Sequence, residues 1–184
     1  MKKKIALLGD SIRQIGYGTV VPDMLGENYE VFQPEDNCRF AKYTLRMLFD
    51  FKDILKDCEV IHWNNGLWDV CDIFEDGVLF STDEEYVENI LRIARILKSF
   101  TPNVIFATTT PVHPTYTYNR NEDIQRFNAL VVPRLKEIGI QINDLYPVVA
   151  ADFDNLLCED KIHLSQKGIQ LCADKVVAAI KSFE

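Results

Sequence analysis

The segment Lys3-Lys-Ile-Ala-Leu-Leu-Gly-Asp-Ser11 joins a short apolar run to a turn, and its pattern returns along the chain. A near-continuous apolar run of this length is typical of a strand that is covered on both faces, as in a parallel sheet. Four later runs have the same character. We therefore expect five strands, over residues 3–8, 29–32, 59–63, 103–108 and 140–144.

Apolar residues at helical spacing fill the intervals between these strands. The sequence predicts a capping box at Ser81 and Glu84, a kink or break at Pro133, and a last helix that begins near Gln166 with Ser165 as its N-cap. The helical positions are Leu45, Leu48, Phe49, Lys52 and Leu55; Val87, Ile90, Leu91, Ala94 and Leu97; Ile124, Phe127, Val131, Leu135 and Ile138; and Ile169, Cys172, Ala173, Val176 and Ile180.

Strict alternation of strands and helices predicts an α/β fold. We expect a three-layer α/β/α sandwich with a five-stranded parallel sheet and right-handed crossovers. No repeat, low-complexity segment or linker interrupts residues 1–184, so we expect one domain over the whole chain. Ligands of such sheets bind at the carboxyl ends of the strands.

Composition limits the function. The 184 residues carry 20 basic and 28 acidic side chains, a formal charge of −8, and 47% of them are hydrophobic. The acidic balance argues against binding to nucleic acid, and no apolar run approaches the ~20 residues that span a bilayer. We expect an acidic, soluble protein whose oligomeric state the sequence does not indicate.

The chain begins with Met1 and three lysines, but the apolar stretch that follows is shorter than the roughly 7–15 residues of a secretory signal. Five cysteines without CxxC spacing suit reduced, mostly buried thiols better than a disulfide framework. Both observations predict a cytoplasmic location.

Polar residues follow four of the strands, where they are expected to share one sheet edge. Ser11, Asn64, His113 and the pair Asp160 and His163 are the residue types of a serine hydrolase. A serine hydroxyl needs a neighbouring base, for which His163 is the candidate. Asp160, three residues earlier, would hold the other nitrogen of that imidazole.

The segments Gly9-Asp10-Ser11-Ile12, Asn64 and Asp160-x-x-His163 together resemble the SGNH (GDSL-type) hydrolases in order and spacing. The resemblance implies a flavodoxin-like sheet with a shallow cleft. It also implies Ser11 as nucleophile, His163 as base, Asp160 as its partner, and an oxyanion hole at Asn64 and the backbone N–H of Ser11.

Two blocks depart from the family pattern. Lys42 stands where the second block, Asn37 to Thr44, has a glycine whose N–H serves the oxyanion hole; lysine keeps that N–H. The third block, usually Gly-x-Asn-Asp, is aligned with residues 62–65, which makes Asn64 the donor and Asn65 the second choice. With Arg39, Lys42 predicts a locally basic cleft that favours a polar or anionic substrate.

Several residues have a simpler structural interpretation. His62 is expected to be a core or sheet histidine, and Trp63 and Trp68 are either buried packing or a stacking platform. Asp10, Asn65 and His113 are candidate substrate contacts, although Asn65 and His113 fit structural roles nearly as well. No metal site is expected, because the three histidines lie far apart in the sequence without an HExxH motif.

These observations predict a cofactor-independent serine esterase that works through an acyl-enzyme. The preferred substrate is a small acyl (acetyl) group on a carbohydrate or another polar alcohol, without a nucleic-acid or membrane partner. The alternatives are an acyltransferase with the same triad and a non-catalytic binding protein that retains the fold.

Overall fold

The computed structural model describes residues 2–184 and contains one five-stranded sheet in which every neighbouring pair of strands is parallel. The strand order is β2-β1-β3-β4-β5, so β1 lies between the second and third strands of the sequence. The strands are β1 (Lys3–Leu8), β2 (Tyr29–Phe32), β3 (Val60–Asn64), β4 (Asn103–Ala107) and β5 (Gln141–Asn143). The predicted number and parallel arrangement of the strands are confirmed.

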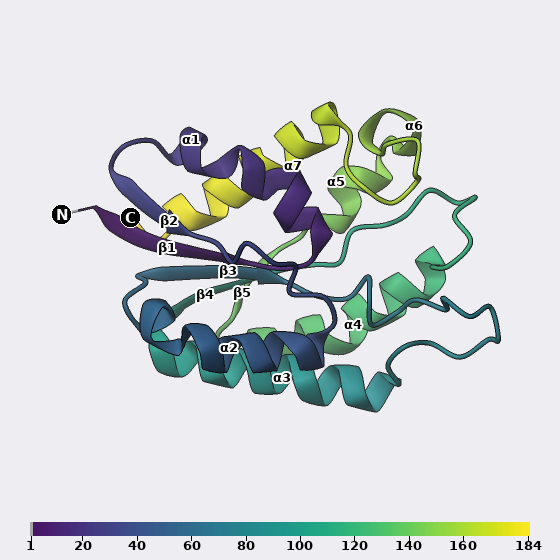
Figure 1. Cartoon of the computed structure of the whole chain (residues 1–184), viewed down its shortest axis with the longest axis horizontal. Coiled ribbons are helices and arrows are strands. Elements are labelled where there is room, and N and C mark those ends of the chain that lie inside the picture. Colours follow the sequence, from purple (N-terminus) through teal and green to yellow (C-terminus); the bar gives the residue numbers. More distant parts are fainter. Residues whose placement is uncertain (1) are drawn as a thin grey trace.

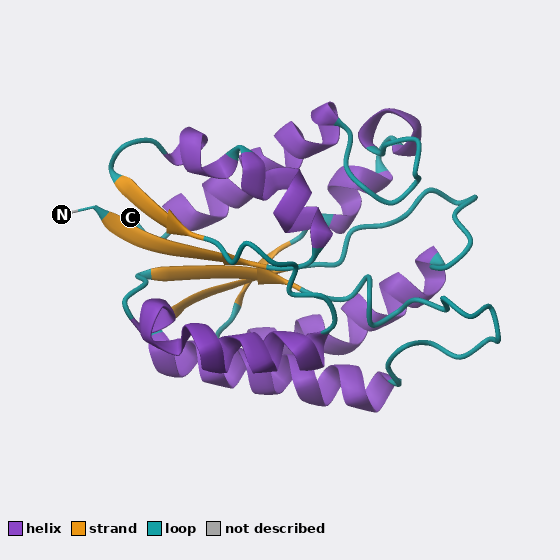
Figure 2. Cartoon of the chain, in the orientation of Figure 1, coloured by secondary structure: helices purple, strands orange, loops and turns teal. Residues whose placement is uncertain are grey.

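Helices cover both faces of the sheet (Figures 1 and 2). One layer contains α2 (Ala41–Lys56), α3 (Asp83–Phe100) and α4 (Asn121–Glu137), and the other contains α1 (Val21–Leu25), α5 (Tyr146–Ala150), α6 (Phe153–Leu156) and α7 (Gln166–Lys181). Two short turns of helix, η1 (Ile12–Gly16) and η2 (Tyr17–Thr19), connect β1 to α1. The three-layer α/β/α sandwich is therefore confirmed.

Burial on both faces explains why the strands are apolar throughout. Ile5 to Leu8 of β1 and every residue of β3 are buried, and Trp63 packs on Phe106 with ring centroids 4.9 Å apart. Tyr86 of α3 and Phe127 of α4 are also fully buried and lie against each other. Two layers of helices thus remove most of the three central strands from water, and burial of apolar surface is the main favourable term in folding.

The helix ends correct the predicted capping box by one residue. Thr82, not Ser81, is the N-cap of α3: its hydroxyl accepts the N–H of Glu85, whose carboxylate accepts the N–H of Thr82. Ser81 instead donates to the buried carboxylate of Asp69. The prediction failed because Ser and Thr, and Glu84 and Glu85, are adjacent and chemically equivalent at these positions.

Two other local predictions had different outcomes. Ser165 is the N-cap of α7, as expected, and accepts the N–H of Gly168 at 3.2 Å. Pro133 lies inside α4 and does not divide it, since the helix continues to Glu137.

The five cysteines are free thiols, and four of them are buried, while Cys158 is exposed. This agrees with the expectation of unpaired, mostly buried thiols. Within residues 2–184, no helix has the length and apolar character needed to cross a membrane.

Candidate active site

The turn after β1 presents Ser11 at the carboxyl edge of the sheet. Gly9 has φ +154°, and a Cβ at this position would overlap the side-chain oxygen of Asn64, so the turn requires glycine. Asp10 is buried and accepts the N–H of Ile12 at 2.9 Å, which fixes the first residues of η1. Ser11 therefore sits on a short, rigid connection between a central strand and a helical turn.

Ser11, His163 and Asp160 form a continuous chain of hydrogen bonds. His163 Nε2 lies 2.9 Å from Ser11 Oγ, and His163 Nδ1 lies 2.7 Å from Asp160 Oδ2. The serine comes from the end of the first strand and the other two from the turn before α7, where His163 is 152 residues away in sequence. The structure thus brings together the three residues that the sequence nominated for catalysis.

A compact turn holds the Asp160 carboxylate in place. Its Oδ1 accepts the backbone N–H groups of Ile162 and His163 at 3.1 and 3.0 Å, while Lys161, the residue after Asp160, adopts φ +69°. Partial burial acts to raise the pKa of Asp160, but the hydrogen bonds from His163 and Ile162 outweigh it and lower this pKa below its usual value. The carboxylate is therefore ionised and aimed at the imidazole.

The other histidine at this edge belongs to a separate pair. His113 Nε2 lies 3.2 Å from Asp154 Oδ1, and its Nδ1 contacts Thr115 at 2.8 Å. His113 is not among the residues that line the pocket beside Ser11, although its backbone N–H donates to Lys161 at 2.9 Å. These contacts fit the structural interpretation of His113 better than a contact with substrate.

Asn64 lies beneath the nucleophile turn, in a buried hydrogen-bonded network. Its Nδ2 donates to Asp10 Oδ1 at 2.8 Å, and its Oδ1 accepts the hydroxyl of Tyr17 at 2.8 Å. Burial raises the pKa of Asp10, against the lowering effect of the Asn64 hydrogen bond. These contacts use one of the two amide hydrogens of Asn64.

Asn65 is buried as well, and its hydrogen bonds go to other residues than Ser11. Its Nδ2 donates to the carbonyl of Arg39 at 2.9 Å, while its own carbonyl accepts the hydroxyls of Tyr86 and Thr109. Asn65 thus joins the loop before α2 to α3 and to the segment after β4, and these contacts give it a structural role.

The N-terminus of α2 is fixed from the loop after β3. The carboxylate of Asp69, which is buried, accepts the N–H of Ala41 with both oxygens, at 3.1 and 3.0 Å. Lys42 follows as the second residue of the helix, so its N–H is one of the four that a helix leaves without an internal partner.

The contact of Asp69 with Ala41 indicates a second alignment of the third block, which was not predicted from the sequence. Gly66-Leu67-Trp68-Asp69 has the Gly-x-Asn-Asp spacing, with Trp68 in place of the asparagine. Gly66 has φ +150°, and a Cβ there would overlap Thr109. The signal was present in the sequence as a glycine and an aspartate three residues apart, but the adjacent asparagines drew the alignment to Asn64.

A pocket of about 190 Å³ adjoins Ser11 and His163. Its remaining lining residues come from the segments after β3 and β4 and from the turn before α7: Leu67, Trp68, Cys71, Ile73, Tyr116, Tyr118, Asn119 and Ile162. Neither Lys42 nor Arg39 is among them; Arg39 lies over the ring of Tyr43 and pairs with Asp36. The predicted basic character of the cleft is wrong for this pocket.

The two tryptophans have different environments. Trp63 is fully buried in the core, whereas Trp68 is 38% exposed and lines the pocket. His62 is a core histidine, as expected: burial lowers its pKa to about 3, and Asn143 contacts its Nε2 at 3.2 Å.

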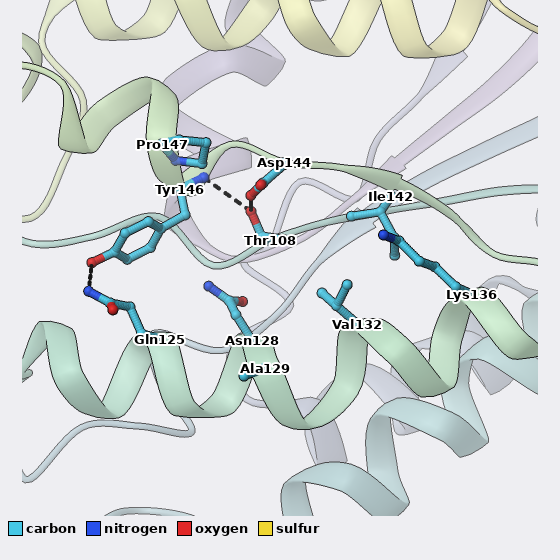
Figure 3. A pocket seen from close by; sticks show the side chains of 10 residues that line it. All are labelled: Thr108, Gln125, Asn128, Ala129, Val132, Lys136, Ile142, Asp144, Tyr146 and Pro147. Carbon is cyan, nitrogen blue, oxygen red and sulfur yellow. Dashed lines mark hydrogen bonds between the residues drawn. The ribbon is translucent and has the colours of Figure 1, made fainter.

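A larger hollow of about 520 Å³ lies at the β5 edge of the sheet, between α4 and α5 (Figure 3). Its polar side chains largely bind one another: Thr108 contacts Asp144 at 2.8 Å, and Gln125 contacts Tyr146 at 2.6 Å. It shares no lining residue with the pocket beside Ser11. Across residues 2–184, no three His, Cys, Asp or Glu side chains are grouped so that they could hold a metal ion.

Neither a scan against protein-family models nor a search of curated proteins finds a match for this sequence. Solved structures do match over nearly the whole chain. The lipase/acylhydrolase from Enterococcus faecalis is 20% identical, with a TM-score of 0.77 over 98% of this chain and 96% of its own. A GDSL-like lipase from Bacteroides thetaiotaomicron is 18% identical, with a TM-score of 0.76 over 99% and 89%.

The acetylxylan esterase Axe2 from Geobacillus stearothermophilus is 15% identical, with a TM-score of 0.78 over 97% of this chain and 94% of its own. At these identities the likeness establishes the fold. The arrangement of strands and helices described above is shared with these lipases and esterases.

Proposed function

We propose that the protein is a serine ester hydrolase in which Ser11 is the nucleophile, His163 the general base and Asp160 the residue that orients the imidazole. The observation that carries this proposal is the chain of hydrogen bonds from Ser11 Oγ through His163 to Asp160, at 2.9 and 2.7 Å. These distances are within the reach that proton transfer to a base requires.

In the proposed reaction, His163 Nε2 accepts the hydroxyl proton while Ser11 Oγ attacks the ester carbonyl. The protonated imidazole then gives its proton to the leaving alcohol, and an acyl-enzyme forms. Water attacks this ester while His163 accepts its proton; the bond to Ser11 Oγ then breaks, the carboxylic acid leaves, and the imidazole returns the proton to Ser11 Oγ. Asp160 holds the Nδ1 hydrogen throughout, so that Nε2 faces Ser11 in the form that accepts a proton.

The oxyanion needs donors that are in place before charge develops. We propose the backbone N–H of Ser11, at the start of η1, and the backbone N–H of Lys42, in the first turn of α2. Asp69 supports this arrangement because it binds the N–H of the preceding residue, Ala41. Asn64 stays a predicted third donor through the amide hydrogen that Asp10 does not use.

For the acyl group, we propose a small one such as acetyl. Its support is the likeness of the fold to the acetylxylan esterase Axe2. The prediction of a polar alcohol relied partly on Lys42, which lies outside the lining of the pocket beside Ser11.

The test is hydrolysis of nitrophenyl esters of graded acyl length, together with labelling by a serine-directed fluorophosphonate. Ser11→Ala is expected to abolish both, whereas Ser99→Ala, an exposed serine of α3, keeps both. A maximum at the acetyl ester supports the small acyl group. Equal rates for Ser11→Ala and the unchanged protein would contradict the proposal, and product formed only when a second alcohol is added would indicate acyl transfer.

A further inference from the structure

The pocket beside Ser11 has an uncharged and mainly apolar lining. It contains three aromatic side chains, Trp68, Tyr116 and Tyr118, and three aliphatic ones, Leu67, Ile73 and Ile162. Among the described residues that line it, none is Asp, Glu, Lys or Arg. A charged group would lose its hydration there without gaining a partner, and a group with many hydroxyls would lose most of its hydrogen bonds.

The one amide in the lining is partly used. Asn119 is buried, and its Nδ2 donates to the carbonyl of Leu67 at 2.9 Å. Cys71 likewise contacts the carbonyl of Trp68 with its thiol at 3.0 Å. The pocket therefore offers few free polar atoms beyond the amide oxygen of Asn119, the two tyrosine hydroxyls and the residues of the triad.

The size of the pocket suits one ring. A dry cavity of about 150 Å³ binds benzene in another protein, and drug-sized ligands occupy about 300–1,000 Å³. The volume here, about 190 Å³, lies just above the first value and below the second range. One six-membered ring with a short attachment matches it.

Hydrogen bonds between the three wall segments hold the pocket open before substrate arrives. Asp72 N–H donates to the carbonyl of Tyr118 at 2.8 Å, and His113 N–H donates to the carbonyl of Lys161 at 2.9 Å. Tyr116 and Tyr118 meet edge to face, with ring centroids 5.8 Å apart. A preformed pocket spares the ordering cost that a flexible one would add to binding.

The position of His163 indicates whether the alcohol part or the acyl part of the ester occupies the pocket. In the proposed reaction this imidazole must pass its proton to the leaving oxygen, so the alcohol lies against it. His163 and its neighbour Ile162 both line the pocket, together with Ser11. The acyl carbonyl faces the proposed donors at Ser11 and Lys42; Ser11 lines this pocket as well, whereas Lys42 does not.

We propose that this pocket binds an uncharged, apolar ring on the alcohol side of the ester, as in an arylmethyl ester. The proposal rests on the proposed function for its chemistry, and it replaces the polar alcohol expected from the sequence. Trp68 and Tyr118, each a little over one third exposed, supply faces against which the ring packs.

Two isomeric esters test the orientation. Benzyl acetate carries its ring on the alcohol, and methyl phenylacetate carries the same ring on the acyl group. We expect kcat/KM for benzyl acetate to exceed that for ethyl acetate by about tenfold or more, as burial of one ring allows. Faster hydrolysis of methyl phenylacetate would overturn the orientation, and faster hydrolysis of an acetylated glucoside would overturn the apolar class.

Variants connect the preference to the pocket. Trp68→Ala is expected to reduce the ratio of benzyl to ethyl acetate hydrolysis about fivefold or more, because it removes one face of the ring site. Phe74→Ala is the matched control: this side chain is 78% exposed in the same segment and does not line the pocket. Equal ratios in the unchanged protein and Trp68→Ala would refute the assignment.

A binding measurement separates this proposal from the proposed function. Benzyl alcohol is titrated into Ser11→Ala by calorimetry, and into the same variant carrying Trp68→Ala or Phe74→Ala. We expect heat of binding that Trp68→Ala removes and Phe74→Ala retains, even if no ester proves to be a substrate. No binding to Ser11→Ala would overturn the pocket assignment, whatever the outcome of the fluorophosphonate labelling.

Discussion

Both carboxylate oxygens of Asp69 accept the backbone N–H of Ala41, at 3.1 and 3.0 Å. The contact joins the loop after β3 to the first residue of α2, next to the proposed oxyanion donor of Lys42. Ser81 Oγ donates to the same carboxylate at 3.0 Å. Burial raises the pKa of Asp69 to about 7, and the charge of Asp10 adds to the rise, while the hydrogen bonds of Ser81 and Ala41 oppose it.

The raised pKa of Asp69 predicts that the free energy of unfolding falls as the pH rises. Between about pH 4 and 7, the folded state keeps a proton on Asp69 that the unfolded chain has lost, so the free energy of unfolding decreases as pH rises. The slope from this one group is at most about 1.4 kcal/mol per pH unit. Asp69→Asn removes it.

Urea unfolding of both proteins at several pH values between 4 and 8 measures this difference. We expect the stability of the unchanged protein, relative to Asp69→Asn, to decline as the pH approaches 7. Parallel profiles for the two proteins would show that Asp69 titrates alike in the folded and unfolded states.

Two aspartate–histidine pairs at the same sheet edge provide a matched comparison. Asp160→Asn is expected to lower kcat about a hundredfold or more, because the amide no longer holds the imidazole in the required tautomer. Asp154→Asn, which removes the partner of His113, is expected to change kcat less than twofold, since this pair does not line the pocket. Initial rates with nitrophenyl acetate measure both, and equal losses would contradict the assignment of Asp160.

Much of this architecture could be predicted from the sequence because the parallel strands are buried on both faces. Runs such as residues 3–8 and 103–107 are apolar without alternation, and glycine or a polar residue follows each one. The turn at Ser11 and the turn with Asp160 and His163 are likewise encoded locally. Topology then brings Ser11 and His163 to the same edge.

The character of the cleft could not be predicted in the same way. Lys42 is the second residue of α2 and does not line the pocket beside Ser11, and the sequence alone does not indicate this. The pocket depends on bonds between distant loops, such as Asn119 to Leu67 and Asp72 to Tyr118, which no local pattern encodes. The sequence therefore leaves Trp68 either as buried packing or as a stacking platform and does not place it in a pocket.

The contacts of Asn64 allow its predicted role to be tested. If its second amide hydrogen serves the oxyanion, Asn64→Ala lowers kcat about a hundredfold, the usual cost of losing one donor. Tyr17→Phe keeps Asn64 but removes the hydroxyl that donates to its Oδ1, so we expect a fall in kcat of less than tenfold. Steady-state rates, with urea unfolding as a check of folding, distinguish the two; equal small losses in kcat would assign Asn64 to structure alone.

His62 predicts a pH dependence of the opposite sign. Burial lowers its pKa to about 3, so between about pH 6.5 and 3 the unfolded chain binds a proton that the folded protein does not. The free energy of unfolding therefore falls as pH is lowered through this range, by at most about 1.4 kcal/mol per unit from this group.

The variant His62→Phe removes that slope. It also leaves Asn143 Nδ2 without its acceptor, which costs about 1–3 kcal/mol at every pH. Urea unfolding at pH 7, 6 and 5 measures the stability of both proteins. We expect their free energies of unfolding to converge as pH falls. A constant difference would mean that His62 is protonated as readily in the folded protein as in the unfolded chain.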